Sequence, residues 1–370
     1  MKRILVPVFL VSVLVSVASA QAFIGAKIGG MGGAGVANAT DLSAVYYNPA
    51  GLMKAGNFEF KLSLNPSYTD YQQVLDAFNS STDPSTFLQD NYAKNLSFQG
   101  DLAGMVGLNI RKIGISMIAL PLEGYAADPL AGENTIYLSK PANALQAGAA
   151  YAVRYDTVLT LGHTFSLPAL PIASLDAGIN IKSISATYGT LNASAGATSS
   201  PYTKGSGSGT AFDLGARTSL DVPVVGSLAV GLVLRDIAGQ INYSRDQEIY
   251  YFNLDNTITK SAESKLADDS VTLDPVTVIG AAATIPTINL AVAADLEMKK
   301  SETVTHLGVE YPLMVGVLIG RAGLASSPSI SKTTLGVKLN LPFLTLDAAT
   351  IMDGKDSSVV GWVIDIGAGF

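Results

Sequence analysis

Alternation with a period of two residues is the feature that most constrains this chain. In residues 58–65 every even position is apolar and every odd position is polar. Similar alternation recurs over residues 175–182, 212–217, 289–297, 306–311 and 335–341. Because successive side chains of a strand point to opposite faces, each segment has one apolar face and one mixed face. After residue 22 no apolar run approaches the roughly 18 residues of a spanning helix, so the pattern predicts an all-β protein.

The second face of these strands favours a membrane barrel over a soluble sheet. Only 14% of the residues are charged, whereas an ordinary globular domain has roughly 25%. The mixed faces carry glycine, alanine and single charges of both signs, which suits a crowded barrel interior. Strands exposed to lipid must close into a barrel, because hydrocarbon cannot satisfy an open edge. We therefore expect a transmembrane antiparallel β-barrel, with a secreted β-sandwich as the alternative.

The connections between the segments predict the number of strands. Strands of an outer-membrane barrel alternate between short periplasmic turns and long external loops. Long polar connections are expected at residues 69–94, 127–142, 192–208 and 244–273, and short ones at 111–112, 222–227, 285–287, 312 and 341–343. The two kinds alternate only if residues 143–167 form one long strand. This gives about fourteen strands, with sixteen as the alternative.

The first residues have the pattern of an export signal. Lys2 and Arg3 precede an apolar run, and Ala18-Ser19-Ala20 supplies the small residues that a signal peptidase recognises. Ala20-Gln21-Ala22 is a second register. The run is shorter than the ~20 residues of a membrane anchor. We expect a signal peptide at 1–20, an amino-terminal segment at 21–56 and a barrel at 57–370, located in the bacterial outer membrane.

The final residues alternate up to a terminal aromatic side chain. Phe370 shares an apolar face with Trp362, Ile364 and Ile366. A last strand ending in Phe resembles the signal that outer-membrane barrels present to their insertion machinery. We therefore expect Phe370 to act as the insertion signal, and the alternative is an ordinary last strand with an aromatic end.

Composition excludes several functional classes. With no cysteine, the chain has no disulfide framework and no cysteine nucleophile. A net charge of -7 without a basic stripe argues against binding nucleic acid. Neither His163 nor His306 lies beside a recognisable serine motif, so we expect no enzyme activity and no cofactor. Asp268, Asp269 and Asp274 could hold calcium, but a solvated acidic loop explains them better.

The segment before the first strand is rich in small residues. Gly30, Gly32 and Gly35 have the spacing of a dinucleotide fingerprint, but no βαβ unit surrounds them and we expect the chain to be exported away from nucleotides. Gly-Ala-Gly-Val-Ala at 33–37 is followed by Asp41 and then by Asn-Pro-Ala-Gly-Leu at 48–52. This block resembles the amino-terminal region of FadL-type (OMPP1/FadL/TodX-like) outer-membrane transporters of long-chain fatty acids and aromatic hydrocarbons. PorV-like and TraF-like barrels begin with a similar block.

The resemblance implies a hatch in the lumen. In the FadL-type family this segment lies inside the barrel, so Asn48, Pro49, Ala50 and Gly51 are the expected hatch and ligand-gating residues. Small residues can pack tightly in a lumen, and Pro49 has no amide hydrogen to leave unsatisfied. The alternative is an ordinary turn that leads into the first strand.

The resemblance also implies a function. The expected activity is uptake of small hydrophobic compounds such as fatty acids or aromatic hydrocarbons, which leave sideways through the barrel wall. Hydrophobic ligands, outer-membrane lipids and the barrel-insertion machinery are the expected partners. The alternative is a non-transporting, PorV-like accessory that binds secretion components or cargo. Aromatic residues of the external loops, Tyr125, Tyr250, Tyr251 and Phe252, form either a capture groove or an interfacial girdle.

Alternation also predicts which charged residues face the interior. Their mixed signs suggest a lumen filled by ion pairs. The predicted interior residues are Glu59, Lys61, Arg154, Asp176, Lys182, Asp213, Arg217, Arg235, Asp295, Glu297, Glu310, Lys338 and Asp365.

Overall fold

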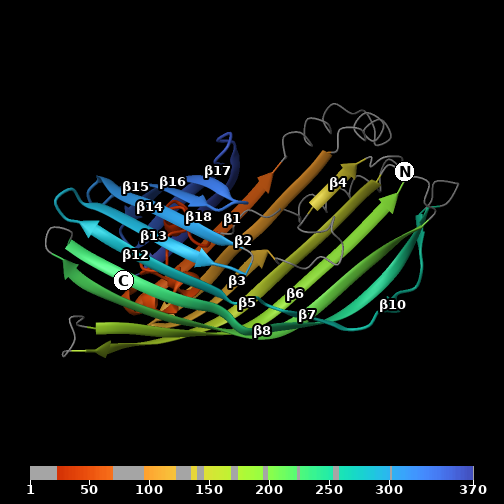
Figure 1. Ribbon diagram of the computed structural model, residues 1–370, viewed down its shortest axis with the longest axis horizontal. Coiled ribbons are helices and arrows are strands. Elements are labelled where there is room, and N and C mark those ends of the chain that lie inside the picture. Colours follow the sequence, from red (N-terminus) through yellow and green to blue (C-terminus); the bar gives the residue numbers. More distant parts are fainter. Residues whose placement is uncertain are drawn as a thin grey trace.

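The strands form one antiparallel sheet that closes on itself. The computed structural model describes residues 23–69, 96–121, 135–139, 146–167, 174–194, 199–222, 226–252, 258–300 and 302–369. The first strand, β1 (Phe58–Thr69), pairs on one side with β2 (Leu96–Ile110) and on the other with β18 (Val359–Gly369). This last pairing closes the sheet into a barrel (Figure 1). The expected signal peptide and Phe370 lie outside the described residues.

The described strands occupy fourteen positions around the barrel, as alternation predicted. Two positions consist of shorter pieces. Between β2 and β5 lie both β3 (Ile113–Pro121) and β4 (Thr135–Ser139). The pieces that pair with β8 on its other side are β9 (Ile258–Lys260), β10 (Ser264–Lys265), β11 (Asp269–Thr272) and β12 (Val276–Ile285).

Long and short strands lie on different parts of the barrel. The long ones, with 21 to 27 residues, are β5 (Gln146–Ser166), β6 (Ser174–Ser194), β7 (Ser199–Val222) and β8 (Gly226–Phe252). Short strands of 9 to 12 residues are β13 (Leu290–Met298), β14 (Thr303–Met314), β15 (Leu318–Ser326), β16 (Ser331–Leu341), β17 (Leu344–Asp353) and β18. Figure 1 shows the long strands running well past the short ones at one end.

Alternation decides which side chain faces inward, as expected. On β1, Phe60 and Leu64 are exposed on the outside, whereas Lys61, Ser63 and Asn65 are buried. An apolar outside around a polar interior is the pattern of barrels whose outer surface faces hydrocarbon. None of the described helices is long and apolar enough to cross a membrane.

Three of the expected loops contain strand. Residues 199–208, expected as a flexible loop, belong to β7, and β8 continues to Phe252 while β9, β10 and β11 lie within the expected 244–273 connection. Between 127 and 142, β4 is also strand. Glycine is unfavourable in strands and serine often occurs in turns, but pairing on both sides satisfies the backbone of β7 and overrides that tendency.

Of the predicted short connections, that at 222–227 includes residues 223–225, which lie outside the described residues, and the others agree with expectation except at Pro312. Tight turns follow β2 at Arg111–Lys112, β12 at 286–289 and β16 at 342–343. Pro312, expected in a turn, lies within β14 opposite Ile319, and the turn comes at 315–317. The pairing shifts register between Pro312 and Met314, which is where a sheet tolerates a residue without an amide hydrogen.

Candidate functional site: the inner wall and the amino-terminal segment

The amino-terminal segment (residues 23–56) is almost completely buried against the inner wall. It contains three short helical turns, α2 (Ala26–Gly29), α3 (Ala44–Tyr47) and η1 (Pro49–Lys54). Its apolar residues include Ile24, Ile28, Leu42 and Leu52, all of them fully buried. A segment with so little regular structure needs other partners for its backbone polar groups.

Side chains of the wall supply those partners. The Asp295 carboxylate of β13 accepts hydrogen bonds from the backbone N–H of Gly35 and Val36, at 2.7 and 2.9 Å. The Asp365 carboxylate of β18 accepts one from the N–H of Ala26 at 2.8 Å. The Thr334 hydroxyl likewise accepts a hydrogen bond from the N–H of Gly32. Other wall side chains donate to carbonyls of the segment: Asn65 to Phe23, Asn109 to Gly56, and Arg217 to Ala37. The segment is therefore bonded to strands from most of the circumference.

Asn48 links three parts of the molecule. Its side-chain N–H groups donate to the carbonyl of Val36 at 2.9 Å and to the carbonyl of Ala216 on β7 at 3.1 Å. Its side-chain oxygen accepts a hydrogen bond from the N–H of Ala50 at 3.1 Å, which caps η1. Pro49 begins η1, where the missing amide hydrogen costs nothing.

Glycines of the wall allow this close approach. A Cβ at Gly215 of β7 would lie 2.1 Å from the Asn48 side-chain oxygen, and one at Gly178 of β6 would lie 2.4 Å from the Pro49 carbonyl carbon. Within the segment, a Cβ at Gly51 would lie 2.1 Å from the Ala39 carbonyl oxygen. Asn48, Pro49, Ala50 and Gly51 are thus all buried at the wall.

An ion pair joins the segment to β1. The Lys61 ammonium lies 2.5 Å from the Asp41 carboxylate and donates to the Ser43 hydroxyl at 2.8 Å. Burial by itself raises the pKa of Asp41, but the Lys61 ammonium beside it holds that pKa well below its usual range. The pair therefore stays charged at neutral pH.

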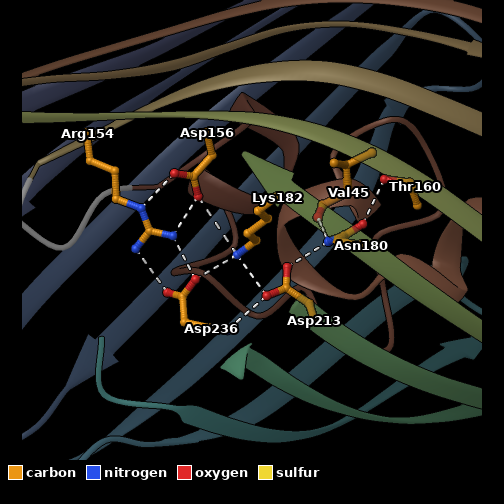
Figure 2. Close-up of polar contacts among 8 residues, drawn as sticks. All are labelled: Val45, Arg154, Asp156, Thr160, Asn180, Lys182, Asp213 and Asp236. Carbon is orange, nitrogen blue, oxygen red and sulfur yellow. Dashed lines mark hydrogen bonds and ion pairs between the residues drawn. The ribbon is translucent and has the colours of Figure 1, made fainter. Parts of the chain in front are cut away.

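A charged cluster lies on the inner faces of the long strands (Figure 2). We define it by its residues, Arg154 and Asp156 of β5, Lys182 of β6, Asp213 of β7 and Asp236 of β8. The Arg154 guanidinium contacts both Asp156 and Asp236, at 2.6 and 2.7 Å. The Lys182 ammonium lies 2.7 Å from Asp213 and 3.0 Å from Asp236. Three carboxylates surround two cations, so the ionised cluster is negative.

Asn180 connects the charged cluster to the amino-terminal segment. Its side-chain N–H groups donate to the Val45 carbonyl and to the Asp213 carboxylate, both at 2.7 Å. Its oxygen accepts from the Thr160 hydroxyl at 2.7 Å. Figure 2 shows Asn180 between Val45 and Asp213.

The inward-facing residues of β6 show the order of the surfaces along the lumen. Gly178 contacts the segment, Asn180 contacts both segment and cluster, and Lys182 belongs to the cluster. Beyond them the wall becomes apolar. We call this part the apolar layer, consisting of the buried side chains of Ile184, Ala186, Tyr188, Ala211, Ile241 and Tyr243.

Glycine shapes the apolar layer too. A Cβ at Gly205 would lie 2.0 Å from the Tyr188 ring, and one at Gly207 would lie 2.6 Å from the Tyr243 ring. The two rings meet edge to face, with centroids 5.5 Å apart. Glycines of residues 192–208, which suggested a flexible loop in the sequence, thus make room for aromatic rings.

The predicted interior residues lie on the inner wall. Ten of the thirteen are buried, and Glu59, Glu310 and Lys338 are partly buried. Beyond the charged cluster, ion pairs join Arg217 to Asp176, Arg235 to Glu297, and Arg321 to both Glu310 and Asp347. Much of the lumen is therefore filled by ion pairs, as expected.

Among the described residues, sequence reasoning missed several interior charges, including Asp156, Asp236, Arg321 and Asp347. Asp156 and Asp347 lie at inward-facing positions of the alternation in their strands, so the period-two pattern does predict them. Arg321 stands between Gly320 and Ala322, which gives no clear pattern. Asp236 follows inward-facing Arg235, but it also reaches the cluster because β8 changes register there and Asp236 has a φ of 55°.

The histidines and the acidic loop have structural partners. The His306 ring lies 2.7 Å from the Gly32 carbonyl oxygen, and exposed His163 packs edge to face against Phe165. Asp269 pairs with Arg245, and Asp274 pairs with Lys300.

The position of Tyr250 distinguishes between a capture groove and an interfacial girdle. The Tyr250 ring packs edge to face against Tyr202, which by alternation lies on the same face of β7 as exposed Phe212 and Leu214. This outward placement favours a girdle. Tyr125 lies outside the described residues.

Comparison with known proteins supports the fold. No match was found among models of protein families or among curated proteins. Among solved structures, the chain is similar to the Ralstonia pickettii toluene transporter TbuX, with a TM-score of 0.60 and 12% identity over 94% of this chain and 98% of that one. The P. putida toluene transporter TodX has a TM-score of 0.59 and 12% identity over 94% of this chain and 98% of that one. A Pseudomonas aeruginosa FadL homologue has a TM-score of 0.56 and 12% identity over 95% of this chain and 99% of that one. The chain thus has the fold of the FadL-type barrels that its amino-terminal block resembles.

Proposed function

We propose that this protein takes up small hydrophobic compounds across the bacterial outer membrane. The observation that carries the proposal is the order of surfaces along β6, from the apolar layer through the charged cluster to the amino-terminal segment. The apolar layer lies toward the end of β6 that leads to residues 195–198, which is the external end in the expected orientation. A hydrophobic compound arriving from outside would therefore meet the apolar layer first. Similarity to barrels described as toluene transporters supports this reading.

The amino-terminal segment serves as a hatch in this proposal. Asn48, Pro49, Ala50 and Gly51 hold it against β6 and β7. Because wall side chains satisfy so many of its backbone groups, displacing the whole segment would break many hydrogen bonds at once. Small local shifts near Asn48, with exit through the wall, fit this arrangement better than release of the whole segment.

The charged cluster favours neutral ligands. Both of its cations already contact carboxylates, and the cluster carries more negative than positive charge. A fatty-acid anion would bring another negative charge toward it. We therefore propose neutral compounds, such as aromatic hydrocarbons, as better ligands than fatty-acid anions.

Native mass spectrometry and ligand binding on folded, detergent-extracted protein test this function. The probes are toluene and sodium laurate. Toluene should bind, and Ile184→Asn should weaken its binding because the change places an amide in the apolar layer. Ile181→Asn, on the outward face of the same strand, is the matched control and should leave toluene binding unchanged. Absence of toluene binding to the folded wild-type protein would overturn the proposal.

A second candidate function has an observation of its own. The interior is filled by ion pairs, and β5 to β8 extend far beyond the short strands, which gives a large ordered surface at one end. Such a barrel suits a PorV-like accessory that binds secretion components or cargo. A barrel that carries no ligand but retains a stoichiometric protein partner in the mass spectrum would support this role instead.

Export and insertion complete the proposal. Residues 1–20 would direct the chain out of the cytoplasm, and Phe370 would present the last strand to the barrel-insertion machinery. Replacing Phe370 with Ser should reduce the amount of folded barrel in outer-membrane fractions without changing the amount exported.

A further inference from the structure

Three neighbouring turns at one end of the barrel present large apolar side chains. They join β12 to β13, β14 to β15, and β16 to β17. At their tips, Ile288 is 53% exposed, Val315 81% and Phe343 84%. Leu313 and Met314, which lead into the middle turn, are also exposed. Side chains of this size are rarely left in water as a group.

The turns at the opposite end of the same strands are polar. The β13–β14 turn carries Lys300 and Glu302, the β15–β16 turn carries Ser327 and Ser329, and the β17–β18 turn carries Asp356. Their side chains bond one another or the nearby backbone, as Ser329 does with Glu302 at 2.6 Å. The apolar tips are thus a property of one end of the barrel and not of its turns in general.

A turn elsewhere on the apolar end provides a contrast. The β2–β3 turn consists of Arg111 and Lys112. Lys112 donates hydrogen bonds to the carbonyls of Ala55 and Gly56, and Arg111 is exposed. The same end therefore has a charged tip on one side of the barrel and an arc of apolar tips over β12 to β17.

Strand length explains where these tips must lie. Strands of 9 to 12 residues cover roughly 30–40 Å along the chain at ~3.3 Å per residue. Tilted by about 40°, they rise roughly 23–31 Å, which only just matches the ~25 Å apolar band of an outer-membrane barrel. These strands leave no length to carry their turns clear of the membrane.

We infer that the arc of turns over β12 to β17 is embedded in the inner-leaflet lipid. Its apolar tips continue the exposed apolar surface of the strands, so the same acyl chains and glycerol backbones that surround the barrel contact them. Arg111, on the other side, lies at the level of the phosphate groups. The barrel is therefore seated more deeply along β12 to β17 than at β2 and β3. This inference depends on the membrane location but not on transport.

Single-cysteine labelling tests the inference directly, because the chain has no cysteine of its own. Val315→Cys and Phe343→Cys are the test variants, and Arg111→Cys is the control at the same end. Each is labelled with an environment-sensitive fluorophore and reconstituted into vesicles of phosphatidylethanolamine and phosphatidylglycerol. Lipid spin-labelled near its ester groups and iodide on both sides of the vesicle serve as the two quenchers. Heat-modifiable migration on a gel confirms that each variant is folded.

We expect the spin-labelled lipid to quench the labels at 315 and 343 more strongly than the label at 111, and iodide to show the reverse order. Equal quenching by iodide at all three positions would overturn the inference and leave the turns as a surface for a periplasmic protein. Toluene binding by the same labelled proteins separates the two proposals. A variant that binds toluene while its apolar turn lies in water contradicts only the lipid seating.

Discussion

The Asn180 side chain of β6 donates a hydrogen bond of 2.7 Å to the Val45 carbonyl of the amino-terminal segment. Through the same amide, Asn180 also contacts Asp213 of the charged cluster. One buried side chain thus connects the barrel's ion-pair network to the segment proposed as the hatch. We therefore expect movement of the segment near α3 to be coupled to rearrangement of the cluster.

Replacement of Asn180 by alanine tests this coupling. Asn180→Ala leaves the buried Val45 carbonyl without this donor, which should cost about 1–3 kcal/mol. Hydrogen exchange at the amides of Tyr46 and Tyr47 should become faster, because α3 loses its attachment to the wall. Asn242→Ala, at an exposed position of β8, is the control. Unchanged exchange in Asn180→Ala would mean that the segment is held without this bond.

A methyl group at Gly215 should displace the segment. In Gly215→Ala the new Cβ would lie 2.1 Å from the Asn48 side-chain oxygen, and the adjoining Pro49 ring leaves little room for it to move. Overpacking of this kind costs about 1–3 kcal/mol. Trypsin should then cut the folded barrel more rapidly at Lys27 or Lys54.

Gly320→Ala is the control for this experiment, since the nearest atom to its Cβ is the end of the flexible Leu313 side chain, at 3.1 Å. Equal resistance of both variants to trypsin would contradict a tight contact between Asn48 and β7.

Alternation in the sequence predicted much of this architecture because an apolar outer surface and a packed, charged lumen impose opposite demands on neighbouring residues. It located the fourteen strands and placed Lys61, Arg154, Lys182 and Asp213 on the inner wall. The external ends of β7 and β8 were missed because the glycines there serve ring packing by Tyr188 and Tyr243, which depends on neighbours distant in sequence.

Contacts that depend on exact register were beyond the sequence pattern. Asp236 joins the cluster only because β8 changes register beside it, and nothing local marks that irregularity. Bonds such as that of Asn180 with Val45 join residues 135 positions apart. The Asn48 motif could be recognised by its resemblance to a family, but its partner Ala216 could not.

Removal of Lys61 should destabilise the protein in a pH-dependent way. Lys61→Met leaves Asp41, which is partly buried, without its cation, at a cost of about 2 kcal/mol at pH 7. Folding lowers the pKa of Asp41, so the stability that this carboxylate adds is present above its unfolded pKa of about 4 and is lost as the pH falls toward the lowered value. Thermal unfolding at a series of pH values measures the difference.

The difference in unfolding stability between wild type and Lys61→Met should therefore be largest at neutral pH and should become smaller below pH ~4. Lys300→Met, which removes an exposed pair with Asp274, should change stability by less than about 1 kcal/mol. A stability difference that does not vary with pH would show that Lys61 acts through packing and not through Asp41.

The sign of the charged cluster predicts unequal effects of two substitutions. Arg154→Met leaves three carboxylates with one cation and should cost about 3–5 kcal/mol. Asp236→Asn balances the cluster and keeps a similar shape, so it should cost much less. Denaturant unfolding in detergent gives both values. Equal destabilisation by the two variants would contradict a cluster whose excess charge is negative.

Asp236→Asn also tests the preference for neutral ligands. Removing one negative charge weakens the repulsion of an anion, so laurate should bind on the order of tenfold more tightly, or ~1.4 kcal/mol. Toluene has no charge, and its affinity should not change. Isothermal titration of the folded variant and the wild type with both probes measures the two affinities. If laurate binds the two proteins equally while toluene binds both, the charged cluster does not select between anionic and neutral compounds, and the selection must come from elsewhere in the lumen.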